Sequence, residues 1–356
     1  MNLSREGHRL IRSRRYTEAQ NLFAEGLALA PQNPYLLAGM GDALRSLGEP
    51  AAAAKYYQRV LASEPDNLFA LRGLGDARRD LQDWASAVAL WSRYLEKRPD
   101  DIFVLTRLGD GSKALGRFSE AERNYRRALA VAPQDRYSRM GLADLYQKNG
   151  RPAEALSHYR ELIRLGVELV NILTITAQLC SQLGEHEEAR RFYERVLAKE
   201  SDNPYALYGL GDYHRWRQDY RQAIVVWERI LEKGKGTINM RSRLGDAHRK
   251  LGNFTEAEGY YEGILAERHD RYALAGLIKL RCLQGEIAAA AAGYEEYRRR
   301  EGEDWQFLAD LEHLLDEAGH RERMRDFYRR SLALLAPQES LRGLLQERLA
   351  ALEEKP

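Results

Sequence analysis

Apolar, small and polar positions repeat along this chain with a period of 34 residues. A glycine recurs at that spacing, an alanine follows it after twelve residues, and a large aromatic residue follows after four more. The glycines are Gly7, Gly41, Gly75, Gly109, Gly211 and Gly245; the alanines are Ala19, Ala53, Ala87, Ala121, Ala223 and Ala257; the aromatics are Phe23, Tyr57, Trp91, Tyr125, Trp227 and Tyr261. A fixed period of this length predicts stacked supersecondary units rather than one compact core.

Each period is interpreted as a pair of helices, and we number its positions so that the recurring glycine is position 8. Glycine inside a helix costs about 1 kcal/mol relative to alanine. Its recurrence therefore indicates a close approach by the second helix, where the alanine at position 20 is the natural counterpart. Position 17 starts this second helix with a large apolar residue, and Pro50 and Pro152 stand there in two units, as suits a first helical turn.

The repeated phrase, Gly-Asp-Ala-Leu at 41 and Gly-Asp-Ala-Arg at 75, resembles the tetratricopeptide repeat family. The resemblance implies an all-α fold, a right-handed superhelical α-solenoid of tandem helix-turn-helix hairpins with a C-terminal capping helix. Ten units are expected within residues 1–337, starting near 1, 34, 68, 102, 136, 170, 204, 238, 271 and 305. Ala143 and Ala177 replace the glycine in units five and six, and units nine and ten keep only part of the pattern.

Residues 338–356 are expected to form a capping helix and tail. An amphipathic stripe over 338–353 consists of Leu341, Leu344, Leu345, Leu349 and Leu352. Its plain interpretation is a cover for unit ten, because a terminal repeat needs a polar outer face. The alternative is self-association through these leucines. The glycines near 232–237 indicate a turn, or alternatively a hinge.

Composition narrows the function classes. The formal net charge is only +2, so no affinity for polyanions is implied. Cys180 and Cys282 lie three repeats apart, which argues against a disulfide framework. No apolar run approaches the ~20 residues of a membrane helix, and the N-terminus lacks an apolar signal core. We therefore expect a cytoplasmic protein without membrane insertion, unless an export signal has been removed.

No catalytic or cofactor site is apparent, so the protein is not expected to be an enzyme. His214 and His248 share position 11 of consecutive units, but a third metal ligand is missing, and core packing is the expected role. The Gly-x-Gly phrases that begin at Gly39, Gly73 and Gly209 lack a preceding strand and a third glycine, which opposes dinucleotide binding. Neither a metal nor a cofactor is predicted.

The resemblance implies that positions 2, 5, 9, 12 and 13 of each first helix line a concave face. Position 9 is aspartate in six units, position 12 is basic in five of these, and position 2 is aromatic in six. The candidate partner-binding residues are Asp42, Arg45, Asp76, Arg79, Asp110, Lys113, Asp144, Asp212, Arg215, Asp246 and Arg249, the aromatics Tyr35, Phe69, Phe103, Tyr137, Tyr205 and Tyr272, and Trp216 at position 13.

Two interpretations of this surface remain open. The charges can satisfy one another within a helix or between successive units, with the position-2 rings half-buried. Alternatively, an extended or helical peptide lies along the groove, with Trp216 as its best single anchor. The lysine–asparagine clamp by which some family members hold chaperone tails is absent, since no unit combines those residues at positions 5 and 9.

The function predicted from these observations is a non-catalytic protein-interaction scaffold or adaptor that binds a peptide or partner protein along its concave groove. One alternative is a substrate-recognition segment of a larger enzyme assembly. A less favoured alternative is a helical-repeat nucleic-acid binder, because the interleaved aspartates oppose phosphate groups.

Overall fold

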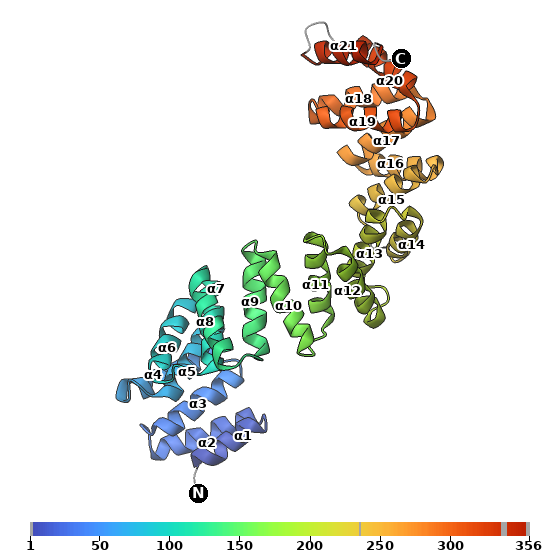
Figure 1. Cartoon of the computed structure of the whole chain (residues 1–356). Coiled ribbons are helices and arrows are strands. Elements are labelled where there is room, and N and C mark those ends of the chain that lie inside the picture. The colour runs from blue at the N-terminus through green and yellow to red at the C-terminus, as the bar shows by residue number, and fades with distance from the viewer. Residues whose placement is uncertain (1–2, 235, 336–339, 354–356) are drawn as a thin grey trace. The chain divides into compact units, whose positions relative to one another are not determined.

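The computed structural model describes residues 3–234, 236–335 and 340–353. The chain forms two compact units, Met1–Leu183 and Gly184–Pro356, a division that the sequence pattern does not predict. All regular elements in the described residues are helices, joined by short turns (Figure 1).

The N-terminal unit contains α1 (Leu3–Arg12), α2 (Tyr16–Leu29), α3 (Pro34–Ser46), α4 (Pro50–Ser63), α5 (Leu68–Asp80), α6 (Trp84–Lys97), α7 (Ile102–Ala114), α8 (Phe118–Val131), α9 (Arg136–Lys148), α10 (Pro152–Arg164) and α11 (Val170–Gln182). The C-terminal unit contains α12 (His186–Lys199), α13 (Pro204–Trp216), α14 (Tyr220–Glu232), α15 (Ile238–Lys250), α16 (Phe254–Glu267), α17 (Arg271–Gln284), α18 (Ile287–Glu301), α19 (Trp305–Glu317), α20 (Arg321–Leu334) and α21 (Ser340–Glu353). The odd-numbered helices are the first helices of the hairpins, and the even-numbered helices up to α20 are the second.

Local sequence explains where the first helices begin. Asn67, Asp101 and Asp135 are N-caps whose side chains accept hydrogen bonds from backbone N–H groups of the first turn of α5, α7 and α9. Such caps satisfy donors that have no partner within the helix. In α3, the Asn33 cap is followed by Pro34 at the first helical position, where a missing N–H costs nothing.

The recurring glycines make room for the aromatic ring at position 24. Tyr57 is fully buried. A Cβ atom on Gly41 would lie 2.7 Å from its ring, and Gly73 of the next unit approaches the same ring from the other side. The ring therefore lies between two helices that only glycine allows to approach. The same arrangement surrounds Phe23, Tyr125 and Tyr261.

Arginines at position 26 connect four of the units to the turn before them. The guanidinium of Arg93 donates to the carbonyl oxygen of Pro65 at 2.8 Å. The equivalent bonds run from Arg59 to Pro31, from Arg127 to Pro99 and from Arg229 to Ser201. This hydrogen bond is a repeated contact between neighbouring hairpins, and it was not part of the sequence prediction.

The helix α21 packs on α20 of its own chain. Leu341 and Leu345 are fully buried in a cluster with Leu308 and Phe327, while Leu349 and Leu352 pack partly against it. The backbone carbonyl of Leu352 also accepts hydrogen bonds from Arg325. The stripe therefore covers the end of the C-terminal unit, which opposes self-association through its buried leucines. Residues 338–339 of the predicted helix, and 354–356 of the tail, lie outside the described residues.

Candidate functional site

Two adjoining pockets follow the first helices of the N-terminal unit. The first, of about 380 Å³, is lined by residues of α1, α3, α5 and α7. The second, of about 700 Å³, is lined mainly by α7, α9 and α11. Both include Phe103 and Arg107, so they are continuous, and we call them together the N-terminal groove. All eleven candidate residues of this unit line it: Tyr35, Asp42, Arg45, Phe69, Asp76, Arg79, Phe103, Asp110, Lys113, Tyr137 and Asp144.

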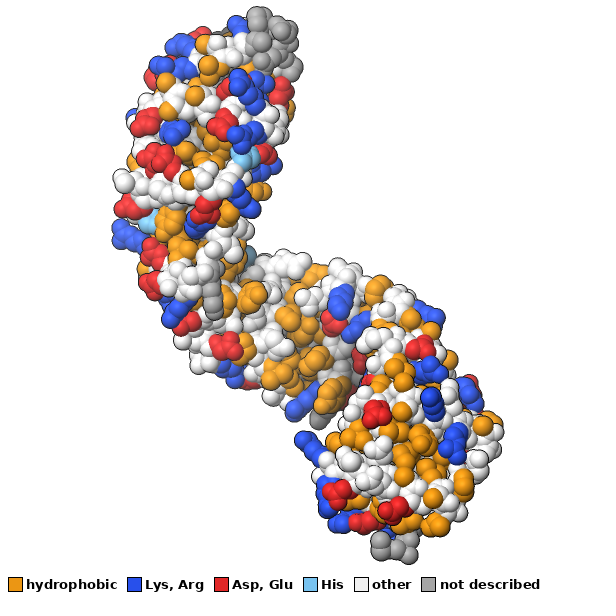
Figure 2. All heavy atoms as spheres, turned by 180° about the vertical axis from the view of Figure 1, so that it is seen from behind, with side chains coloured by type: hydrophobic (Ala, Val, Ile, Leu, Met, Phe, Trp, Pro, Cys, Tyr) orange, Lys and Arg blue, Asp and Glu red, His pale blue; other side chains and the backbone are white. Residues whose placement is uncertain are grey.

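The position-2 aromatics are exposed along this groove. The exposed fractions are 67% for Tyr35, 64% for Phe69, 73% for Phe103 and 73% for Tyr137. The alternative in which these rings are half-buried is therefore wrong. In the C-terminal unit, Tyr205 and Tyr272 are equally exposed. Figure 2 shows that apolar side chains are mixed with charged side chains of both signs on the face that it presents.

Three of the position-9 aspartates accept a hydrogen bond from a tyrosine of their own unit. The hydroxyl of Tyr57 donates to Asp42 at 2.5 Å, and the hydroxyl of Tyr261 donates to Asp246 at 2.8 Å. Asp110 accepts the same bond from Tyr125. Because the position-8 glycine lets the ring approach the first helix, the tyrosine hydroxyl reaches the next residue of that helix. The aspartate is thus part of the packing between the two helices.

Where position 24 is tryptophan, an arginine from the next unit replaces the tyrosine hydroxyl. Trp91 and Trp227 lie against Gly75 and Gly211 of their own units, and position 6 of the following unit is then arginine. Arg107 Nε lies 3.3 Å from Asp76 Oδ1, and Arg243 pairs with Asp212. Where the ring is Phe23, Tyr57, Tyr125, Tyr193 or Tyr261, position 6 of the next unit is Gly39, Gly73, Gly141, Gly209 or Gly276. Tyr159, followed by Ile175, and Tyr294, followed by Asp310, are exceptions.

The basic residues of the candidate set mostly pair with the acidic ones. Between units, Arg45 lies 3.6 Å from Asp76 and 3.5 Å from Asp80, and Lys113 lies 2.6 Å from Asp144. Within single helices, Arg215 pairs with Asp212, Arg249 with Asp246, and Arg79 with Asp80. Burial opposes ionisation of Asp144, but the hydrogen bond and charge of Lys113 outweigh it and lower the pKa of this carboxyl group. The interpretation in which these charges satisfy one another therefore describes most of them.

Two candidates are too buried to contact a partner. Asp76 is 3% exposed, and the Arg249 side chain is 8% exposed. The N-terminal groove also contains polar residues that the sequence prediction missed, among them His8, Arg72 and Arg107. His8 occupies position 9 of unit one, where other units have aspartate, and this could have drawn attention to it.

In the C-terminal unit, the candidate anchor Trp216 is 51% exposed. Its ring lies 4.2 Å from the ring of His186 and 6.0 Å from that of Tyr213, measured between centroids. Trp216 therefore belongs to a surface aromatic cluster and packs against the rings of His186 and Tyr213. The two histidines at position 11 have packing roles: His214 contacts Tyr213, and His248 stacks on Tyr260.

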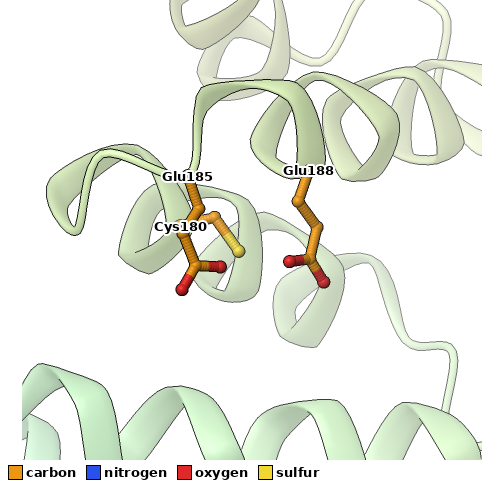
Figure 3. A group of neighbouring side chains, drawn as sticks. All are labelled: Cys180, Glu185 and Glu188. Carbon is orange, nitrogen blue, oxygen red and sulfur yellow. The ribbon is translucent and has the colours of Figure 1, made fainter.

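Both cysteines are free thiols and buried. Cys180, Glu185 and Glu188 place one ligand atom each within 4.8 Å of one another (Figure 3). Each of the three has an interaction partner already, and two carboxylates beside a buried thiol do not make a metal site on their own. In the part of the chain that the structure describes, no helix is long and apolar enough to span a membrane.

Comparison with known families identifies the repeat. The family model of the tetratricopeptide repeat matches residues 4–67, 38–102, 106–166 and 177–236, and a second model of the same repeat matches 241–271. The chain belongs to the tetratricopeptide repeat family. The helical pairs α17–α20 and the covering helix α21 lie beyond the matched ranges. None of the curated proteins matches the chain.

The chain is similar to parts of several solved structures. PilW, a widely conserved type IV pilus biogenesis factor, is 19% identical, with a TM-score of 0.51, over 57% of this chain and 94% of its own. A crystal structure of MamA is 20% identical, with a TM-score of 0.44, over 46% of this chain and 95% of its own. Another MamA structure is 27% identical, with a TM-score of 0.42, over 46% and 96%. The likeness to PilW concerns the fold alone, and the predicted all-α solenoid is confirmed.

Membership of the tetratricopeptide repeat family supports the predicted role as a protein-interaction scaffold. Arrays of this kind stack repeats so that each contacts its neighbours, and they use the extended concave surface for binding.

Proposed function

We propose that the protein is a non-catalytic scaffold that binds an extended peptide segment of a partner along the N-terminal groove. One observation carries the proposal: Tyr35, Phe69, Phe103 and Tyr137 present four largely exposed aromatic rings, one per unit, in two continuous pockets. Exposed aromatic residues in a polar setting are preferred hot spots of protein interfaces. The charges between the rings mostly satisfy one another, so the rings are the main source of binding free energy.

The proposal predicts that the double substitution Phe69→Ala and Phe103→Ala weakens partner binding at least tenfold, or about 1.4 kcal/mol. Both rings are largely exposed in the free protein, so the fold should be retained. A partner captured from the native host is purified, and its affinity for the wild-type protein and the variant is measured by titration calorimetry. Circular dichroism checks the fold.

The matched control is Leu29→Ala. Leu29 is 83% exposed, lies at the end of a second helix and does not line the groove, so its loss should leave affinity unchanged. Trp216→Ala tests the aromatic cluster of the C-terminal unit in the same way. Unchanged affinity in the Phe69/Phe103 variant would remove the N-terminal groove as the binding surface.

A further inference from the structure

Four arginines surround a single buried carboxylate in the N-terminal groove. Asp76 is 3% exposed. Arg107 Nε and Arg45 Nη1 approach its oxygens at 3.3 and 3.6 Å. The charges of Arg79 and Arg72 also act on this carboxyl group. We call Arg45, Arg72, Arg79 and Arg107 the arginine cluster.

Asp76 does not balance this cluster. Burial raises the pKa of Asp76 even though all four arginines act to lower it. Burial also lowers the pKa of Arg107, and the charges of Arg79, Arg45 and Arg72 add to that effect against the opposing charge of Asp76. Arg107 is thus repelled by the other three arginines. A further negative charge at this place would relieve the repulsion.

Arg72 is the cation that remains available. Its side chain is exposed, and no hydrogen bond or ion pair to it is found within the described ranges. Arg79, by contrast, pairs with Asp80 at 2.8 Å. Arg45 and Arg107 pair with Asp76, and Arg45 also pairs with Asp80. A single carboxylate suits Arg72, whereas a phosphate group would bring additional negative charge towards Asp42 and Asp76 in the same pocket.

The position of Arg72 also defines the neighbours of that carboxylate. Phe69 and Arg72 are three residues apart on α5 and therefore share one helix face, and Phe103 of the next unit lines the same pocket. Phe69 and Phe103 belong to α5 and α7, which the ion pair between Arg107 and Asp76 connects.

We propose, building on the function proposed above, that the N-terminal groove selects an extended internal peptide segment with an aspartate or glutamate side chain bound by Arg72. Apolar side chains of the same segment contact Phe69 and Phe103, which line the same pocket. Guanidinium–carboxylate hydrogen bonds are charge-assisted and can be bidentate, and the donors of Arg72 are available for them.

The test is selection from a displayed library of random twelve-residue peptides whose C-termini are fused to the carrier, so that no terminal carboxylate is free. The wild-type protein should enrich peptides with one acidic residue among apolar residues. The variant Arg72→Glu should enrich lysine or arginine at that place. Synthetic amidated peptides from the wild-type selection should bind Arg72→Glu at least tenfold more weakly by fluorescence polarisation, while Arg72→Lys should retain part of the affinity.

Arg123→Glu is the matched charge-reversal control. Arg123 is exposed on α8, a second helix of the N-terminal unit. Reversing its charge should leave both the selected sequences and the affinity unchanged. Thermal unfolding followed by circular dichroism checks every variant. If Arg72→Glu does not fold, Arg72→Gln replaces it, with loss of acidic enrichment as the expected result.

The outcomes separate the two proposals. Enrichment of apolar peptides without an acidic residue, lost in the Phe69→Ala and Phe103→Ala variant, would overturn selection by Arg72 and leave the groove as the binding surface. If the Arg72 variants and the Phe69→Ala and Phe103→Ala variant enrich the same peptides as the wild-type protein, both proposals are overturned. Failure to enrich any peptide would also overturn both.

Discussion

Replacing Gly73 by arginine should destabilise the N-terminal unit by about 3 kcal/mol, the upper part of the range for overpacked cores. A Cβ atom at this position would overlap the ring of Tyr57, which is fully buried and already lies against Gly41. Because the ring lies between two helices, it cannot move away without separating them. Urea unfolding followed by circular dichroism measures the loss.

The same substitution should be tolerated far better together with Tyr57→Trp. The following unit already combines Trp91 with Arg107, and the ring of Trp91 lies against Gly75 of its own unit. The new arginine can then pair with Asp42, which loses the hydroxyl of Tyr57. We expect a coupling free energy of at least ~1 kcal/mol between the two substitutions in a double-mutant cycle.

Gly259→Arg is the control for this cycle. Gly259 lies inside α16, and a Cβ atom there would meet nothing within 4 Å. Replacing this glycine should be neutral or should stabilise the helix by up to ~1 kcal/mol. If Tyr57→Trp leaves the cost of Gly73→Arg unchanged, the relation between the ring at position 24 and the residue at position 6 of the next unit is not steric.

Leu345→Asp should detach α21 from α20. Leu345 is fully buried in the terminal cluster, and an unpaired charge at such a place typically costs about 3–5 kcal/mol. Hydrogen exchange measured by mass spectrometry should show a loss of protection in α20 and α21. Protection in the N-terminal unit should not change, because stability in such arrays depends on nearest neighbours.

Gln346→Asp is the matched control, since it places the same charge one residue further along on an exposed part of α21. Its exchange pattern should remain that of the wild type. Sedimentation of the Leu345→Asp variant also tests the covering role. A protein that stays fully protected and monodisperse would show that the end of the C-terminal unit does not need this helix.

The periodic part of the fold is predictable because one packing relation recurs. A ring such as Tyr57 needs a gap, and only glycine at Gly41 and Gly73 provides it, so the constraint appears directly in the sequence every 34 residues. The division between residues 183 and 184 leaves no such mark. The arginine bonds from position 26 were missed because their acceptors are backbone carbonyl groups, which any residue can offer.

The candidate site was predicted less completely. The positions that line the groove followed from the family resemblance, and the exposed rings occupy them. The ion-pair and hydrogen-bond partners of each charged residue could not be predicted, because they depend on which side chains of neighbouring repeats come within contact distance. Asp42 accepts a hydrogen bond from a tyrosine and Asp76 forms an ion pair with an arginine, although both occupy position 9. Arg72, at position 5, was not among the predicted residues.

The pairing of each position-24 ring with position 6 of the following unit has a consequence for protein engineering. A transplanted segment cut at the predicted unit starts would separate Trp91 from Arg107, or Tyr57 from Gly73, and would create a clash or an unsatisfied carboxylate at the junction. The exchangeable module in chimeras of this chain should instead run from one second helix to the end of the next first helix. Junctions placed at the turn within a hairpin keep both members of each pair together.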